Sequence, residues 1–525
     1  MATPSVPPAQ RRLASALRKL KQRQDRGQTV FQSDDFTRAD REALVAAGFL
    51  RMVVKGWYLV ARPGDEPSDT TPWFAAMRDF VAGYCNARFA NAWHVSPAFS
   101  LLVHAGATAL PQQVIVHTPL AGNNRLELPG DCSLLILRTP ERPPVGHVEV
   151  RGGLRVLTLP VALLRVPEHL FHTAATDAHV ALAALSDASD LNRELLGGGH
   201  SVIAGRLAGA LRAVGRAELA DDILGTMTAA GYTVTESNPF LVVPPVLTVT
   251  RMAAPHVHRL RLMWRTMRDE VLRHMPEAPG LPSDVLAYLA KVREHYRADA
   301  YHSLSIEGYR VSDVLIERVA SGHWNPQQHA LDKDARNAMA AHGYWRAFEA
   351  VQMSLRELLG GENPGEVARA DHGGWYRELF SPSVAAGLLS TADLAGYRNA
   401  PVYIKNAAHV PPAREAVRDL MPALFDLIAD EPSAAVRAVL GHFCFVFIHP
   451  YMDGNGRIGR FLMNAMLASG GYPWTILRVE WRDRYMSALD AASARGDIGP
   501  FAQLVAHAVQ TEPPTAPTVA SMVAM

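Results

Sequence analysis

Hydrophobic residues recur every three to four positions through the C-terminal half of the chain. From residue 285 to about residue 510, apolar side chains keep this helical spacing, for example in REAVRDLMPALFDLIAD and RIGRFLMNAMLAS. Short strand signals interrupt the pattern only around YRNAPVYIKNA. The pattern therefore predicts a helical domain over residues 285–510, with strand signals only in this short segment.

The preceding segment mixes the two periodicities. Residues 75–245 contain short apolar runs typical of strands (QQVIVHTP, CSLLILRT, RVLTLP) and longer helical patterns (HVALAALSDA, VIAGRLAGALRAVG). This mixture predicts a small α/β domain. The amphipathic stretch RLRLMWRTMRDEVLRHM and the Pro-rich PEAPGLPSD predict a helical linker over residues 250–284. The Thr/Pro-rich residues 511–525 predict a flexible tail.

The N-terminal segment predicts two helices followed by a hairpin. RRLASALRKLKQRQDRG is a basic helical pattern, and Thr37 is placed to cap a second helix over RADREALVAAG. LRMVVKGWYLV then reads as two strands joined at Lys55-Gly56. This order of elements is typical of a winged helix, which we predict over residues 11–62.

The basic residues of this segment are candidates for contact with DNA. Arg38 and Arg41 would lie on the second helix, which in a winged helix enters the major groove, and Lys55 would lie in the hairpin turn. Residues 1–60 hold 11 Lys+Arg and 5 Asp+Glu, a difference of +6. The whole chain carries only +1, so the remainder sums to −5. The alternative is a small helical cap whose charges simply face solvent.

Cysteine usage and hydropathy bear on the compartment. The three cysteines, Cys85, Cys132 and Cys444, are widely spaced and form no C-x-x-C pair, which favours a reducing environment over a disulfide framework. No apolar run reaches the roughly 18–20 residues that a membrane span needs. The N-terminus shows no apolar signal region. We therefore predict a cytoplasmic protein without a membrane partner.

The most unusual stretch is IHPYMDGNGRIGRF, residues 448–461, which joins two predicted helices. Gly454 and Gly456 can adopt positive φ, so that consecutive backbone N–H groups point to one place. The following helix presents its N-terminus there as well. Together these features favour an anion site of the kind that holds phosphates.

The charged residues of the same stretch fit nucleotide chemistry. Arg457 and Arg460 are three positions apart on one helix face, and arginine forks suit phosphate oxygens. Asp453 supplies a hard oxygen for Mg²⁺, which is commonly held by one or two carboxylates together with substrate phosphates. An imidazole has an unperturbed pKa of about 6.5, so His449 can accept a proton from a hydroxyl. The set indicates transfer of a phosphate-containing group from a nucleotide to an alcohol.

HPYMDGNGRIGR resembles the signature of the Fic (filamentation) family, with Tyr451 where phenylalanine is usual. The resemblance implies an all-helical fold and transfer of AMP from ATP to a Ser, Thr or Tyr hydroxyl of a protein. It implies that His449 is the general base and that Asp453 holds Mg²⁺. It also implies that the nucleotide is bound by Gly454, Asn455, Gly456, Arg457 and Arg460.

Two further segments resemble parts of the same family. GYRNAPVYIKNAAHVPP is similar to the flap, a hairpin that docks the target by strand addition, with Pro401, Val402 and Tyr403 near its tip. SLSIEG is similar to the inhibitory motif, in which Ser303 and Glu307 share a helical face. Glu307 would pair with Arg460 and keep ATP from binding productively. The alternative is a surface glutamate on a capped helix.

NAWHVSPAFSLLVHAGATALPQQVIVHTP, which follows the helix-and-hairpin segment, resembles abortive-infection type antitoxin and regulator proteins. Those proteins carry a winged helix before a small α/β domain. The sequence as a whole thus predicts a self-inhibited protein AMP-transferase that modifies a target or itself. Its N-terminal part would bind DNA or the protein target, and a second copy of the chain is a further candidate partner.

Two alternative functions stay open at this stage. Because some Fic-like proteins transfer other phosphate-containing groups or remove AMP, Glu307 could position a water for removal. The other alternative is a transcription regulator that senses ATP without catalysis. His449 argues against this second alternative, because a sensor needs no base.

Overall fold

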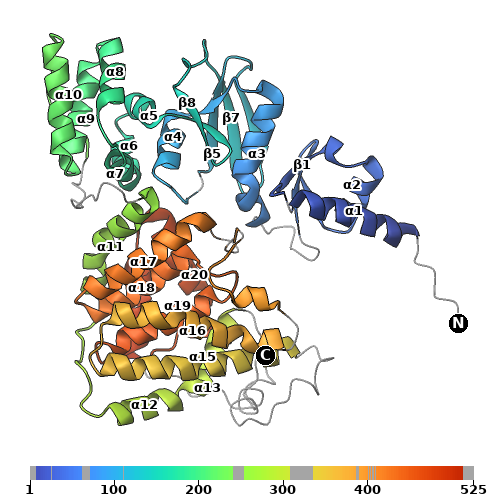
Figure 1. The fold of residues 1–525 in the computed structure, drawn as a ribbon, viewed down its shortest axis with the longest axis vertical. Helices are drawn as coiled ribbons and strands as arrows, with labels where there is room; N and C mark the ends of the chain where they lie inside the picture. The colour runs from blue at the N-terminus through green and yellow to red at the C-terminus, as the bar shows by residue number, and fades with distance from the viewer. Residues whose placement is uncertain are drawn as a thin grey trace. The chain divides into compact units, whose positions relative to one another are not determined.

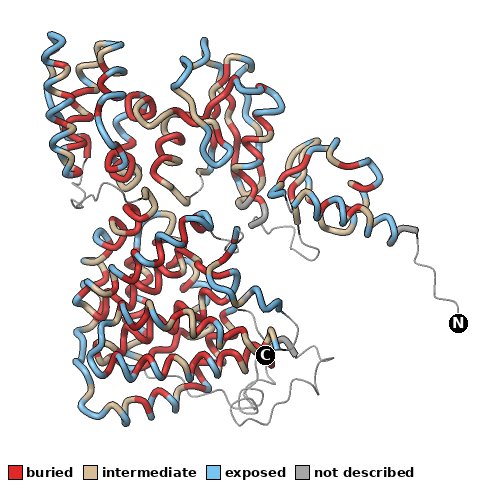
Figure 2. The backbone as a smooth tube through the Cα atoms, viewed as in Figure 1, coloured by how far each residue is buried: buried red, intermediate tan, exposed pale blue. Residues whose placement is uncertain are grey.

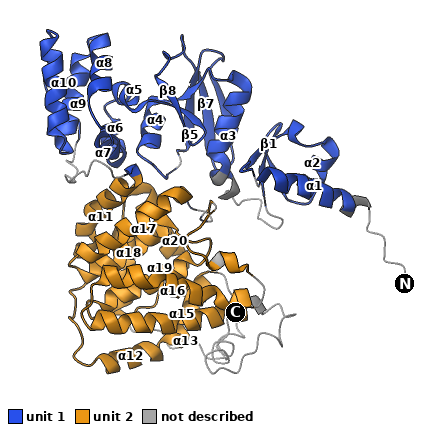
Figure 3. Ribbon diagram, viewed as in Figure 1, with its two compact units in different colours: residues 1–255, 403–410 blue, residues 256–402, 411–525 orange. Residues whose placement is uncertain are grey.

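The computed structural model describes most of the chain, and it divides into two compact units. The described residues are 8–24, 26–61, 71–109, 111–240, 254–307, 335–385, 389–399, 401, 402, 404, 407 and 409–511. One unit holds residues 1–255 and 403–410, and the other holds residues 256–402 and 411–525 (Figure 3). The described residues of the first unit form two clusters of buried hydrophobic side chains.

The first unit begins with two helices and a three-stranded antiparallel sheet (Figure 1). The elements are α1 (Pro8–Gln24), β1 (Val30–Gln32), η1 (Ser33–Asp35), α2 (Arg38–Ala46), β2 (Leu50–Val54) and β3 (Trp57–Val60). Strand β3 lies between β1 and β2. The Thr37 side chain accepts the Asp40 N–H at 3.2 Å, and Gly56 has φ +86° in the hairpin turn. The predicted helices and hairpin are present, whereas the winged-helix class itself stays a prediction.

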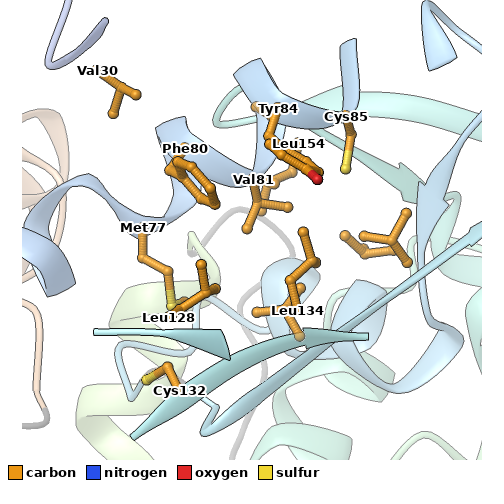
Figure 4. Close-up of a cluster of buried hydrophobic side chains, with 14 of the residues drawn as sticks. Val30, Met77, Phe80, Val81, Tyr84, Cys85, Leu128, Cys132, Leu134 and Leu154 are labelled. Atoms are coloured by element: carbon orange, nitrogen blue, oxygen red, sulfur yellow. The ribbon is translucent and has the colours of Figure 1, made fainter. Parts of the chain in front are cut away.

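A mixed four-stranded sheet follows, packed against helix α3 (Thr71–Phe89). Its order is β4 (His94–Val95), β5 (Gln113–Thr118), β7 (Cys132–Arg138), β6 (Asn124–Leu128), and only the β5–β7 pair is parallel. Figure 4 shows side chains of α3, among them Met77, Phe80 and Val81, facing Leu128 and Leu134 of the sheet. A separate ribbon pairs β8 (Val148–Arg151) with β9 (Leu154–Leu157).

The other regular elements among the described residues of the first unit are helices. They are α4 (Pro97–His104), α5 (Leu159–Arg165), α6 (Leu170–Thr173), α7 (Ala175–Ala183), α8 (Ser189–Gly198), α9 (Ser201–Ala213) and α10 (Ala217–Ala229). Strands and helices thus occur together over the segment where the sequence pattern mixes both periodicities. The predicted domain boundaries within this unit stay predictions.

The second unit is built from helices, with two short 3-10 turns, η3 (Thr391–Leu394) and η4 (Val479–Trp481), among its described residues. The helices are α11 (Pro255–His274), α12 (Val285–Glu294), α13 (Tyr296–Ile306), α15 (Ala335–Leu359), α16 (Pro364–Ala385), α17 (Arg414–Asp430), α18 (Ala434–Ile448), α19 (Asn455–Ala468), α20 (Arg482–Arg495) and α21 (Gly499–Gln510). Helices α18 and α19 are buried along almost their whole length (Figure 2). A helix that is apolar on all sides, as α18 is, belongs in a core.

Helix α11, which lies in the segment expected as a linker, packs within the second unit. Arg268 forms a bidentate pair with Glu431, at 2.9 Å and 3.0 Å, and Trp264 Nε1 donates to the same carboxylate at 3.4 Å. Glu431 in turn accepts the Ser433 N–H near the start of α18. The helix is therefore tied to the same core that carries the unusual glycine-rich stretch.

The described residues of the predicted flap contain one isolated bridge and no strand. His409 pairs antiparallel with Ala109, and the Val410 N–H donates to the Thr108 carbonyl at 3.1 Å. Tyr403, residues 308–334 of the predicted helical domain and residues 512–525 of the predicted tail lie outside the described residues. None of the described helices combines the length and hydropathy that crossing a lipid bilayer requires.

Candidate active site

The glycine-rich stretch forms a tight connection between α18 and α19. Helix α18 ends at His449, which adopts the left-handed conformation with φ +53° and ψ 61°. Helix α19 begins after Gly454, whose φ is +80°. A Cβ on Gly454 would lie 2.7 Å from Phe380 Cε2, so both the backbone angle and the space favour glycine there.

His449 is held as a neutral imidazole. Its Nδ1 lies 3.1 Å from the Val446 carbonyl oxygen, and because a carbonyl only accepts, Nδ1 carries the proton. Nε2 is then the basic nitrogen of the neutral ring. Burial, with a smaller contribution from the charge of Arg398, lowers the pKa of His449 to about 4. At neutral pH this side chain can therefore accept a proton.

Asn455 fixes the shape of the connection. Its Oδ1 accepts the Tyr451 N–H at 2.9 Å, and its Nδ2 donates to the Tyr451 carbonyl at 2.8 Å. The ring of Tyr451 is buried and stacks on Tyr376 with the centroids 3.8 Å apart. The Asn455 side chain is therefore committed to the backbone of the loop, a use that the sequence pattern did not indicate.

Arg460 reaches from α19 to the end of helix α13. Its Nε donates to Ser303 Oγ at 2.8 Å, and its Nη2 donates to the Ser303 carbonyl at 3.0 Å and to Glu307 Oε1 at 2.8 Å. The side chain of Arg460 is only 5% exposed and that of Glu307 is 26% exposed. The structure thus brings together two motifs that lie more than 150 residues apart in the sequence.

The Glu307 carboxylate lies among the positive groups of the glycine-rich stretch. Burial alone would raise its pKa, but the charges of Arg460 and Arg457 outweigh that effect and hold the pKa below its ordinary value. A Cβ on Gly456 would collide with Glu307 Oε1. Glycine at this position therefore admits an anionic group to the N-terminal turn of α19, and in this structure that group is a carboxylate.

Arg457 and Asp453 complete the set. Arg457 is buried, with its guanidinium carbon 5.1 Å from the centroid of Phe380 and its Nη2 3.4 Å from Asp453 Oδ1. Asp453 Oδ1 also accepts the Gly454 N–H at 2.6 Å, while its side chain is 62% exposed. One accessible carboxylate beside an anion site suits Mg²⁺, which retains waters and substrate phosphates as its other ligands. The described residues contain no cluster of three or more potential metal ligands.

Several polar residues around the site carry no motif of their own. Arg398 is buried and donates from Nε to the His449 carbonyl at 2.8 Å. Arg482 Nε donates to the Ile306 carbonyl at 3.0 Å, at the end of the helix that carries Ser303. The Tyr485 hydroxyl lies 2.8 Å from Nε2 of the buried His442. Only their three-dimensional position identifies them.

The remaining predicted residues lie apart from this set. In the first unit, Arg38 pairs with Glu42 on its own helix at 2.8 Å, and Lys55 is exposed in the hairpin turn. Arg41 donates to the Ser33 carbonyl at 2.7 Å. Of the flap residues, Pro401 is exposed and Val402 is buried.

Comparison with known proteins agrees with the position of this site. Residues 375–467 match the model of the Fic/DOC family. The matched residues contain the whole stretch from His449 to Arg460.

Curated relatives are similar over about half of the chain or less. The protein adenylyltransferase Fic of Nematostella vectensis is 40% identical over 262 residues, which cover 49% of this chain and 56% of that protein. The protein adenylyltransferase Fic of Drosophila willistoni is 36% identical over 222 residues, covering 42% and 41%. The Caenorhabditis elegans protein adenylyltransferase fic-1 is 35% identical over 222 residues, covering 41% and 40%. The chain thus spans about half of the length of these relatives or less.

Among solved structures, a fragment of Fic-1 from C. elegans matches with a TM-score of 0.36 and 22% identity. The match covers 64% of this chain and 94% of that one.

Proposed function

We propose that the protein transfers AMP from ATP to a Ser, Thr or Tyr hydroxyl of a protein, either a target or itself, and that it inhibits itself. The observation that carries this proposal is the bond between Glu307 and Arg460 at 2.8 Å, inside the glycine-rich site that also holds His449. The names of the relatives, protein adenylyltransferases, point to the same reaction.

Each residue of the site would have a distinct role in the transfer. His449 Nε2 accepts the proton of the target hydroxyl, and the hydroxyl oxygen forms a bond to the α-phosphorus of ATP. The bond from that phosphorus to the oxygen bridging to the β-phosphate breaks, and pyrophosphate leaves. The backbone N–H groups around Gly454 and Gly456 bind phosphate oxygens, and Arg460 and Arg457 balance their charge. Asp453 would hold Mg²⁺, which neutralises phosphate charge when bound.

Inhibition follows from the position of Glu307. Its carboxylate already accepts a hydrogen bond from the guanidinium that a terminal phosphate of ATP would need. A negative group in a partly buried site also repels phosphate more strongly than it would in water. The inhibited enzyme therefore holds an internal anion in place of part of the triphosphate.

Other parts of the chain would supply target recognition and location. The flap, with Pro401, Val402 and Tyr403, would dock the backbone of the target by strand addition. The N-terminal domain would bind DNA through Arg38, Arg41 and Lys55, or else bind the protein target. The basic excess of the first sixty residues supports the DNA interpretation.

A second candidate within the same fold is removal of AMP from a modified protein. The observation that favours it is again Glu307, a carboxylate that lies close enough to His449 to influence its pKa. Such a group could position a water for attack on the phosphorus of a modified side chain.

The test uses Glu307→Gly protein with ATP labelled in either the α- or the γ-phosphate. Hydrogen bonds to charged groups contribute about 1.5–3 kcal/mol, which corresponds to roughly tenfold or more in an equilibrium. We therefore expect at least about a tenfold gain in α-label on protein, and no γ-label. The matched control is Glu294→Gly, which removes an exposed glutamate at the end of α12.

Each other outcome has a distinct meaning. Transfer of γ-label would indicate phosphoryl transfer. Equal incorporation by wild type and variant would remove the claim of inhibition. If no α-label is transferred, but a pre-modified protein loses AMP, the removal activity would replace the proposed one. If neither occurs while ATP still binds, the alternative of a non-enzymatic sensor gains support.

A further inference from the structure

Arg398 connects three backbone segments that are separate in the sequence. Its Nε donates to the His449 carbonyl at 2.8 Å, and its Nη2 donates to the Pro412 carbonyl. Its own backbone N–H donates to the Pro450 carbonyl at 2.8 Å. The side chain is buried at 5% exposure. Each contact involves a charged or backbone donor and a backbone acceptor, so the geometry of all three segments is coupled.

Two of these segments are the ends of the predicted flap. Arg398 precedes the flap tip and Pro412 follows it, and they are 14 residues apart. The bond from Nη2 to the Pro412 carbonyl closes this loop at its base. Because the guanidinium is planar and its donors have fixed directions, closing the loop also orients the Nε–H toward the His449 carbonyl.

The third segment is the connection that carries His449. This residue has φ +53°, a conformation that non-glycine residues adopt at a cost of roughly 1–2 kcal/mol. Such a conformation persists only when surrounding contacts determine it. The His449 N–H donates to the Phe445 carbonyl, and Arg398 holds the His449 carbonyl on the other side of the residue. Arg398 thus restrains the backbone from which the imidazole projects.

We propose that Arg398 is a positioning residue, which sets the imidazole of His449 and the base of the flap in a fixed relation. This inference rests on the proposed AMP transfer. The hydroxyl that the flap brings to the site must meet Nε2 of His449 and the phosphorus at the same time. A displacement of about 1 Å at such a site can lower a rate by roughly 100-fold.

The test measures initial rates of self-modification against ATP concentration, in full-length protein that carries Glu307→Gly. We expect Arg398→Ala to lower kcat by about 10- to 100-fold, with the KM for ATP unchanged within error. Arg398→Lys keeps the charge but loses the planar fork, and its kcat should lie between that of the parent and that of Arg398→Ala. Rates are expressed per folded enzyme, with the folded fraction measured by circular dichroism, because loss of folded protein alone would lower the apparent kcat and leave the KM unchanged.

Arg414→Ala is the matched control. Arg414 also donates from Nη1 to a carbonyl at the flap base, that of Asn399, but its side chain is 55% exposed and it pairs with Glu415. Its loss should leave kcat at the parent value. If Arg414→Ala loses as much activity as Arg398→Ala, general disturbance of the flap base explains the effect and the proposal is wrong.

The remaining outcomes are also decisive. Parent-level kcat in Arg398→Ala, or a loss expressed only in the KM for ATP, overturns the proposal. If Arg398→Ala does not fold, Arg398→Lys decides: a lowered kcat at unchanged KM supports positioning, and full kcat contradicts it. Failure of AMP transfer itself is distinguishable, because the Glu307→Gly parent with intact Arg398 would then incorporate no α-label.

Discussion

Arg38 and Arg460 both lie on helices and both bind a carboxylate at 2.8 Å, yet their surroundings differ in every other respect. Arg38 is 84% exposed and pairs with Glu42, four residues further along the same helix. Arg460 is 5% exposed and binds Ser303 and Glu307 from a helix more than 150 residues away in the sequence.

The difference shows how much each pair says about function. An exposed pair one helical turn apart forms in almost any amphipathic helix, is screened by salt and contributes little. A buried arginine must find partners in the tertiary structure, and losing one partner leaves a charge without solvent. The site in the second unit is therefore specified by its contacts, whereas the surface of the N-terminal helices is compatible with DNA, protein or solvent.

The largest expected loss of AMP transfer comes from substitution of His449, which lies in the buried site. In Glu307→Gly protein, His449→Ala should lower the transfer of α-label by roughly 100- to 10,000-fold, because a positioned general base contributes that much. Binding of ATP, measured by calorimetry, should remain, since the proposed phosphate contacts come from the N-terminal turn of α19 and the loop before it. Substantial transfer in the double variant would show that this imidazole is not the base.

A smaller loss of AMP transfer is expected on substitution of Asn455. This substitution tests whether the shape of the loop matters for activity apart from the stability of the protein. Asn455→Ala leaves the buried N–H and carbonyl of Tyr451 without their partner, at a cost of about 2–4 kcal/mol of unfolding free energy. Chemical denaturation measures this loss. In Glu307→Gly protein, Asn455→Ala should also lower AMP transfer, because the connection between α18 and α19 loses its shape.

Asn464→Ala is the comparison for that variant. Asn464 lies on the same helix and bonds in the same way to the N–H and carbonyl of Thr475, away from the glycine-rich connection. We expect a similar loss of stability with AMP transfer retained at temperatures where the protein is folded. Equal losses of activity in both variants would mean that stability alone limits the rate.

The smallest effect is expected at the exposed arginine. Arg38→Gln should leave the unfolding free energy unchanged within error. If the N-terminal domain binds DNA, the same change should weaken binding to a short mixed-sequence duplex and reduce the salt slope by about 1. Arg41→Gln should behave differently and lower stability by about 1 kcal/mol, because Arg41 bonds to the Ser33 carbonyl. An unchanged salt slope in Arg38→Gln would remove this residue from the predicted DNA contact.

Sequence patterns predicted the local parts of this site well. Gly454 has the positive φ that was expected of it, whereas Gly456, for which the same was expected, lies within helix α19 and is not among the glycines with positive φ. The helical periodicity indicated the helices on either side. The patterns could not predict hydrogen bonds whose partners lie elsewhere in the fold. The commitment of Asn455 to the Tyr451 backbone and the bonds of Arg398 depend on where the chain returns, which no residue spacing encodes.

The sequence by itself determined the described helices of the second unit and the hairpin near Lys55, because periodicity and backbone freedom are local properties. It also determined the residue types of the proposed phosphate-binding site. The resemblance of SLSIEG implied that Glu307 pairs with Arg460, and the structure shows this bond at 2.8 Å. Only the tertiary structure revealed that Arg398 holds the His449 carbonyl. The physical reason is burial: a guanidinium removed from water must be matched by acceptors, and the folded chain alone brings those acceptors from remote helices and loops.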